Sequence, residues 1–145
     1  MLTVALLAAA VSPFLPATAV RATNEAGTMS KTIAVVIGTR TFSATLVDNE
    51  TTDALTRLLP LSVTMTELNG NEKLFRLPGA LPTAASRPAS IRTGDLMLYG
   101  TNTIVLFYKS FPTTYSYTRL GRIDDVSGLE AALGPGSVAV TFEAR

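Results

Sequence analysis

Aromatic, hydroxyl and cationic side chains are concentrated in one stretch of the chain, LFYKSFPTTYSYTRLGRIDD, which runs from Leu106 to Asp125. Within it, Tyr115 and Tyr117 alternate with a serine and a threonine. Arg119 continues the tyrosine face if the segment is a strand, because successive side chains of a strand point to opposite faces. Tyrosine offers a flat apolar ring with a polar tip, and a neighbouring arginine can stack on a ring or bind a carboxylate or amide.

These side chains indicate a ligand-binding face, to which we assign no catalytic group. Its predicted members are Tyr99, Asn102, Tyr115, Tyr117 and Arg119. Simpler interpretations stay open at the sequence level. The tyrosines of the TYSYTR run could belong to the core, and Arg119 could form an ion pair at the rim with Asp124 or Asp125. Phe107 lies in an all-apolar run, which predicts that it packs in the wall of the fold.

Two residue types that carry much enzyme chemistry are among those missing from the chain, and their absence excludes several chemistries. The sequence contains no cysteine and no histidine. Ser-His-Asp catalysis, Cys-His catalysis and zinc sites built on thiolate or imidazole are therefore excluded. Acid-base catalysis would need a carboxylate, lysine or tyrosine with a shifted pKa. No phosphate-binding loop, dinucleotide fingerprint or nucleophile elbow is present, and Asp124-Asp125 lacks further ligands at loop spacing. We predict no cofactor and no metal site.

Length and charge place the chain among small single-domain proteins. Its 145 residues suggest one domain, and 47% hydrophobic residues is an ordinary globular share. The chain carries 12 basic and 11 acidic residues, for a net charge of +1. This balance gives no electrostatic reason to expect nucleic acid or an anionic membrane surface as a partner.

The first 29 residues differ from the rest. Leu2 to Val11 is an apolar run too short to span a bilayer, and Ala17-Thr18-Ala19 resembles a cleavage site after Ala19. No lysine or arginine precedes the apolar run, however, and MSKTIAVVIG from Met29 is also typical of a natural start. We therefore expect either a signal peptide, which makes the protein periplasmic or secreted, or a spurious extension of a cytoplasmic protein. In both cases residues 1–29 lie outside a domain at residues 30–145.

The first half of the domain has clear strand and helix signals. Ile33 to Ile37 is an apolar, β-branched run, and residues 41–46 alternate between hydroxyl and apolar side chains, which predicts a hairpin through Gly38. A helix is predicted to begin at residues 48–50 and to end before Pro60. Its predicted apolar stripe comprises Ala54, Leu55, Leu58 and Leu59.

The second half alternates short strands with turns. Predicted strands are residues 61–66, 73–77, 96–99, 104–108, 115–123 and 138–142, and residues 128–133 are a predicted short helix. Asn69-Gly70-Asn71 is a strong turn signal, and residues 78–90 are predicted to be a loop. About eight strands and two short helices at this spacing are typical of an antiparallel barrel.

Four segments carry a resemblance to a known family. FSATLVDNETTDALTRLLPL, MTELNGNEK, TGDLMLYG and NTIVLFYKSFPTTYSYTRLGRIDD resemble the bacterial cyclophilin-like domain family, whose small proteins largely lack an assigned function. The resemblance runs from about Thr32 to Glu143. It implies a closed eight-stranded antiparallel cyclophilin-like β-barrel with two short helices over its open ends.

The resemblance does not extend to the isomerase site of true cyclophilins. Those enzymes carry an FHR strand motif, a glutamine, a tryptophan and a histidine around the proline pocket, and this chain has no histidine, tryptophan or glutamine. Arg119 or Arg122 could replace the catalytic arginine only by analogy. The leading interpretation is a binding module for a peptide or small ligand. A weak prolyl isomerase and a structural, self-assembling domain are the alternatives, and the oligomeric state stays open.

Overall fold

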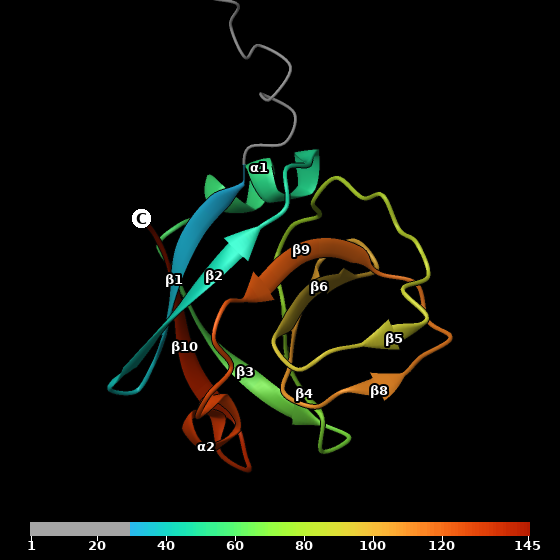
Figure 1. Ribbon diagram of the computed structural model, residues 1–145. Helices are drawn as coiled ribbons and strands as arrows, with labels where there is room; N and C mark the ends of the chain where they lie inside the picture. Colours follow the sequence, from blue (N-terminus) through green and yellow to red (C-terminus); the bar gives the residue numbers. More distant parts are fainter. Residues whose placement is uncertain (1–29) are drawn as a thin grey trace, which may run out of the picture.

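The computed structural model describes residues 30–145, and the predicted leader at residues 1–29 lies outside the described residues. In the described part the chain forms ten strands and two helices (Figure 1). The strands are β1 (Lys31–Ile37), β2 (Arg40–Leu46), β3 (Leu61–Leu68), β4 (Glu72–Arg76), β5 (Ser90–Ile91), β6 (Asp95–Tyr99), β7 (Thr103–Phe107), β8 (Phe111–Pro112), β9 (Thr118–Ile123) and β10 (Val138–Ala144). The helices are α1 (Glu50–Thr56) and α2 (Leu129–Leu133).

Eight of these strands close into an antiparallel barrel, as the sequence predicts. Their order around the barrel is β1-β10-β3-β4-β7-β6-β9-β2. The predicted hairpin of β1 and β2 is confirmed, with Val35 opposite Phe42. Alternation along the strands directs one set of apolar side chains inward, so that Phe42, Ala44 and Leu46 of β2 are all buried.

The two helices lie at opposite ends of the barrel in Figure 1. Asn49 caps α1, because its side chain accepts a hydrogen bond from the Thr52 amide and the Thr52 hydroxyl lies close to the Asn49 amide in return. Leu55 is buried as predicted, whereas Leu58 is 44% exposed. The prediction for Leu58 was wrong because α1 ends at Thr56, so that Leu58 leaves the helical stripe.

A second apolar cluster lies on the outer face of the barrel, over β6 and β7. Its buried members are Ile91, Met97, Val105, Phe107 and Tyr117, with Leu74 and Phe111 packed against them. β5 and β8 pair with each other outside the barrel and cover this face, on the side away from β1 and β10 (Figure 1). The prediction of a plain loop over residues 78–90 missed this two-stranded ribbon, because each of its strands has only two residues.

The start of β9 also differs from the prediction. The strand begins at Thr118 instead of Tyr115, and residues 113–116 run as an irregular segment toward it. The amide and carbonyl of Tyr117 pair with Ser86 at 3.0 Å each, so backbone hydrogen bonds anchor the end of that segment. The register between β6 and β9 then shifts, with Leu96 opposite Gly121 but Met97 opposite Arg119.

Candidate functional site

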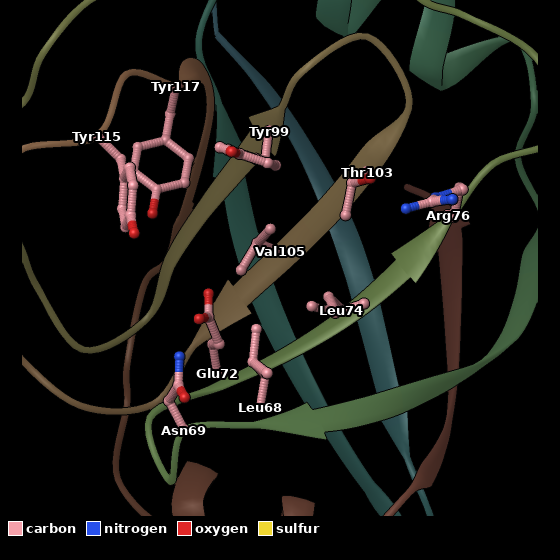
Figure 2. A pocket seen from close by; sticks show the side chains of 10 residues that line it. All are labelled: Leu68, Asn69, Glu72, Leu74, Arg76, Tyr99, Thr103, Val105, Tyr115 and Tyr117. Atoms are coloured by element: carbon pink, nitrogen blue, oxygen red, sulfur yellow. The ribbon is translucent and has the colours of Figure 1, made fainter.

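The ribbon of β5 and β8 leaves part of the outer face open, and the opening is a hollow of about 280 Å³. Figure 2 shows the side chains that surround it. They are Leu68, Asn69, Glu72, Leu74, Arg76, Tyr99, Thr103, Val105, Tyr115 and Tyr117. We call this space the tyrosine hollow. Strands β3, β4, β6 and β7 and the irregular segment before β9 all contribute to it.

The floor of the tyrosine hollow is made by alternating residues of β4 and by β7. Glu72, Leu74 and Arg76 point outward from β4, and Leu74 lies opposite Val105 of β7 in the sheet register. The centre of the floor is therefore apolar, with a carboxylate at one end and a guanidinium at the other. Four residues of strand separate the Cα atoms of Glu72 and Arg76 by about 13 Å.

Three tyrosines form the wall. The ring centroid of Tyr99 lies 6.3 Å from that of Tyr115 and 5.8 Å from that of Tyr117, with interplanar angles of 75° and 55°. Tyr117 is 6% exposed and packs edge-on against Phe107 at 5.6 Å. Tyr99 and Tyr115 are 49% and 62% exposed. Tyr117 thus belongs both to the outer cluster and to the hollow, whereas the other two rings are open to a ligand.

Glu72 is the acidic group that faces into this space. It is only 9% exposed, and none of the residues 30–145 forms a hydrogen bond or ion pair with its carboxylate. Burial, followed by the nearby charge of Glu67, raises the pKa of Glu72. Burial, followed by the charge of Glu72, also raises the pKa of Tyr117. Figure 2 shows the Glu72 carboxylate and the Tyr117 hydroxyl directed into the same space.

Two predicted site residues lie outside the tyrosine hollow. The side-chain amide of Asn102 donates to the Leu77 carbonyl at 3.1 Å, and the backbone carbonyl of Asn102 accepts from the Leu77 amide at 2.7 Å, so Asn102 fixes a turn. Arg119 is exposed, and its carbonyl accepts a hydrogen bond from Asn49 at 2.9 Å. The structure therefore brings together Tyr99, Tyr115 and Tyr117, but neither Asn102 nor Arg119 lines the hollow with them.

The alternative role of Arg119, an ion pair at the rim with Asp124 or Asp125, is also absent from the described part of the chain. Asp124 accepts a hydrogen bond from the Thr45 hydroxyl at 2.6 Å. Asp125 accepts one from the Ser127 amide at 2.9 Å, which lowers the pKa of Asp125. Asp124 thus ties the connection between β9 and α2 to β2, and Asp125 caps a local turn within that connection.

A second polar cluster closes one end of the barrel and was not expected from the sequence. Lys73 is fully buried, and its ammonium donates to the carbonyls of Gly134 at 2.7 Å and Gly136 at 2.5 Å. It also lies 3.2 Å from a carboxylate oxygen of Glu67, which accepts a hydrogen bond from the Tyr108 hydroxyl. Every member of this cluster has a partner, so we assign it to the architecture of the barrel.

In that cluster, the Tyr108 hydroxyl and the Glu67 carboxyl both have shifted pKa values, as expected of groups that hydrogen-bond to each other. Burial and the hydrogen bond to Glu67 raise the pKa of Tyr108 to about 12. Burial alone would raise the pKa of Glu67, but hydrogen bonds from Tyr108, the Gly70 amide and Lys73 outweigh burial and lower it. The pKa values of Glu67 and Glu72 are therefore shifted in opposite directions.

Comparison with known proteins places the chain in a family. A family model described as the cyclophilin-like family matches residues 35–143. The chain belongs to the cyclophilin-like family. A solved relative in fold is a hypothetical protein from Archaeoglobus fulgidus, whose solution structure is 15% identical in sequence. That likeness covers 80% of this chain and 95% of the other, with a TM-score of 0.52, and it supports the fold alone. No curated protein sequence matches the chain.

Two further observations describe this cyclophilin-like protein. Neither of its helices within residues 30–145 has the length and apolar character needed to cross a bilayer. In the same part of the chain, no three histidine, cysteine, aspartate or glutamate side chains come close enough together to hold a metal ion.

Sequence reasoning missed several residues that line the tyrosine hollow, among them Glu72, Arg76, Leu68 and Thr103. The turn signal at Asn69 to Asn71 gave a usable clue, because it places β3 and β4 side by side. Nothing in the letters EKLFR, however, indicates which of their two faces is the outer one.

Proposed function

We propose that this cyclophilin-like protein is a binding module that takes a small ligand, or one side chain of a peptide, in the tyrosine hollow. The observation that supports the proposal is the convergence, around an open space of about 280 Å³, of three tyrosine rings and one carboxylate that has no partner within residues 30–145. Two of the rings stay largely exposed although they are large and partly apolar. Adjacent exposed aromatic rings are typical of interaction sites.

The size of the hollow limits what it can hold. Pockets for drug-sized molecules usually enclose about 300–1,000 Å³. A space of about 280 Å³ lies just below that range, so it suits a small molecule or a single side chain better than an extended ligand. Its wall is also partly preformed, because Tyr117 is packed against Phe107 and pinned through its backbone to Ser86. Preorganisation of this kind reduces the entropy lost on binding.

The tyrosines supply a direct test of the proposal. The chain has four tyrosines and no tryptophan, and three of the four line the tyrosine hollow. We expect a fragment and short-peptide screen, read by tyrosine fluorescence and NMR, to find ligands whose affinity falls at least about tenfold in Tyr115→Ala. Leu58→Ala is the matched control, because Leu58 is similarly exposed but does not line the hollow. Ligands that bind Tyr115→Ala as well as wild type would place the binding site elsewhere.

One observation keeps a weak prolyl isomerase as the second candidate. Arg76 lines the tyrosine hollow beside an apolar floor, and an arginine near the prolyl nitrogen is the element that isomerase chemistry would require. Arg122 lies 3.7 Å from Asp95, and Arg119 lies outside the hollow, so Arg76 is the arginine to test.

We predict that the protein is not an efficient isomerase, because the chain has no histidine, tryptophan or glutamine. A protease-coupled assay on an Ala-Pro peptide measures this. Catalytic efficiency approaching about 10⁷ M⁻¹s⁻¹, lost in Arg76→Ala, would contradict the prediction and make the isomerase the better assignment.

A further inference from the structure

We propose that the ligand of the tyrosine hollow is a small organic ammonium ion, held between the carboxylate of Glu72 and the rings of Tyr99 and Tyr115. This inference rests on the proposed binding function and specifies the chemical class that the hollow selects. It is carried by two features of the site, a mostly buried acid that has no partner among residues 30–145 and a set of tyrosine rings with open faces and edges.

The first step concerns charge. Glu72 is only 9% exposed, and a carboxylate that loses much of its hydration without gaining a partner is costly, so natural proteins usually pair such groups or hydrogen-bond them. The cations nearest to Glu72 along β4 do not neutralise it. Lys73 points into the barrel and is already held by Glu67 and two backbone carbonyls. Arg76 stands about 13 Å away along the strand. A cationic ligand would supply the missing partner from outside the chain.

The second step concerns the rings. The faces of aromatic rings carry partial negative charge and attract ammonium groups within about 6 Å. Tyr99 meets Tyr115 at 75° and Tyr117 at 55°, so the rings are not stacked face to face and do not cover one another. Figure 2 shows the three rings on one side of the hollow and Glu72 below them. An ammonium ion in that space can contact both a ring and the carboxylate.

The charges around the site also argue against an anionic ligand at this end. Glu67 of β3 adds a second negative charge near Glu72, which contributes to the raised pKa of Glu72. Arg76 could attract an anion only at the opposite end of the floor. Leu74 and Val105 lie between the two ends and offer an apolar surface to a short hydrocarbon chain. A primary ammonium ion with a chain of about four carbons fits this arrangement, with its ammonium group at Glu72 and its chain over Leu74 and Val105.

Binding of a cation should depend on pH through Glu72. The groups that face or flank its carboxylate are Glu67 of β3, Lys73 and Arg76 of β4, Tyr99 of β6, Tyr108, Tyr115 and Tyr117. Because burial raises the pKa of Glu72, its carboxyl gains a proton at a higher pH than an ordinary glutamate. Affinity for an ammonium ion should therefore decrease as the pH falls through that raised pKa, while a neutral ligand should show no such loss.

The test uses the full chain, three four-carbon probes of matched size and one larger lysine derivative. NMR titrations compare n-butylammonium with n-butanol and butyrate, and N-acetyl-lysine methylamide serves as the side-chain form of the same cation. We expect n-butylammonium to bind at least about tenfold more tightly than n-butanol, and we expect Glu72→Gln to remove that difference. Glu143→Gln is the matched control, because Glu143 is an exposed carboxylate on β10 that does not line the hollow.

Each outcome decides a different part of the proposal. Preference for the lysine derivative or for the free amine identifies the source of the cation, and either result supports an ammonium site. Equal binding of n-butanol and n-butylammonium, or unchanged cation affinity in Glu72→Gln, would overturn the inference. If neutral fragments bind and depend on Tyr115 while cations do not bind, the binding module survives and only its ligand class is wrong. If no probe and no fragment binds, both proposals are overturned.

Discussion

Glu67 and Glu72 lie five residues apart and have opposite surroundings. Glu67 accepts hydrogen bonds from Tyr108 and from the Gly70 amide, and it forms an ion pair with the buried Lys73. Glu72 is buried more completely and has no partner among the described residues. The pKa of the first is lowered and the pKa of the second is raised. Ionisation of Glu67 should therefore increase the free energy of unfolding, and ionisation of Glu72 should decrease it.

For Glu72 we predict that Glu72→Gln makes the protein more stable at pH 7. An acid whose pKa is raised in the folded state contributes its full stability below the ordinary glutamate pKa of 4.5. This stability is lost as the pH rises through the raised pKa. Glutamine has no charge to desolvate, so the variant keeps that stability. Denaturant melts across pH 3 to 8 should show the two proteins converging at low pH. A less stable variant at pH 7 would show that Glu72 has a structural partner.

Glu67→Gln should act in the opposite direction. A lowered pKa adds stability above the ordinary value of 4.5, and this stability is lost as the pH falls through the lowered pKa. The variant removes the charge that partners buried Lys73, so we expect a cost of about 2 kcal/mol at pH 7. The cost should shrink in acid. Equal melts of wild type and variant at neutral pH would contradict a structural role for this cluster.

At the scale of elements, alternation and turn chemistry were readable from the sequence. The apolar phase of β2 and the turn at Asn69 and Gly70, both with positive φ, follow the predictions. β4 could not be oriented in the same way. Its inward residues are Lys73 and Phe75, and its outward ones include Leu74, so the usual rule of apolar side chains inside gives no answer. Glu72 was missed as a site residue for that reason.

The spacing of the tyrosines correctly indicated that they lie together. The strand expected to carry them, however, does not begin until Thr118. Tyr115 and Tyr117 meet Tyr99 through an irregular segment tied to Ser86, not through continued pairing in β9. The prediction that Arg119 joins the tyrosines in the binding site assumed a continuous strand, but Arg119 does not line the tyrosine hollow. The ribbon of β5 and β8, which covers the outer apolar cluster beside the hollow, depends on contacts between distant segments, and its two-residue strands leave no periodic pattern in the sequence.

The element that supports the wall is β7, and Phe107 is its key residue. The Phe107 side chain is fully buried between Phe111 and Tyr117, at ring distances of 5.7 and 5.6 Å. We predict that Phe107→Ala costs about 3–5 kcal/mol through the cavity it creates. Arg119→Ala should cost about 1 kcal/mol or less, because Arg119 is exposed. Denaturant melts compare the two, and the reverse order would mean that wall and surface have been assigned the wrong way round.

At the scale of the whole molecule, the barrel closes within the described residues. β1 starts at Lys31 and pairs on both edges, with β2 and β10. We therefore predict that a chain lacking residues 1–28 melts as cooperatively as the full chain and at a similar temperature. A broad or lost transition in the short form would show that the leader is structural. Export is tested separately, by the mass of the mature protein, which a signal peptide cleaved after Ala19 would reduce accordingly.

The measurement that tests the central claim most directly is the set of intermolecular NOEs between bound n-butylammonium and the four tyrosine rings of the chain. Three of these rings line the tyrosine hollow, whereas Tyr108 belongs to the closed cluster with Glu67 and Lys73 and serves as an internal control. The predicted result is a set of NOEs to Tyr99 and Tyr115, with none to Tyr108. NOEs to Tyr108 alone, or to no tyrosine, would contradict the assignment of the tyrosine hollow as the binding site.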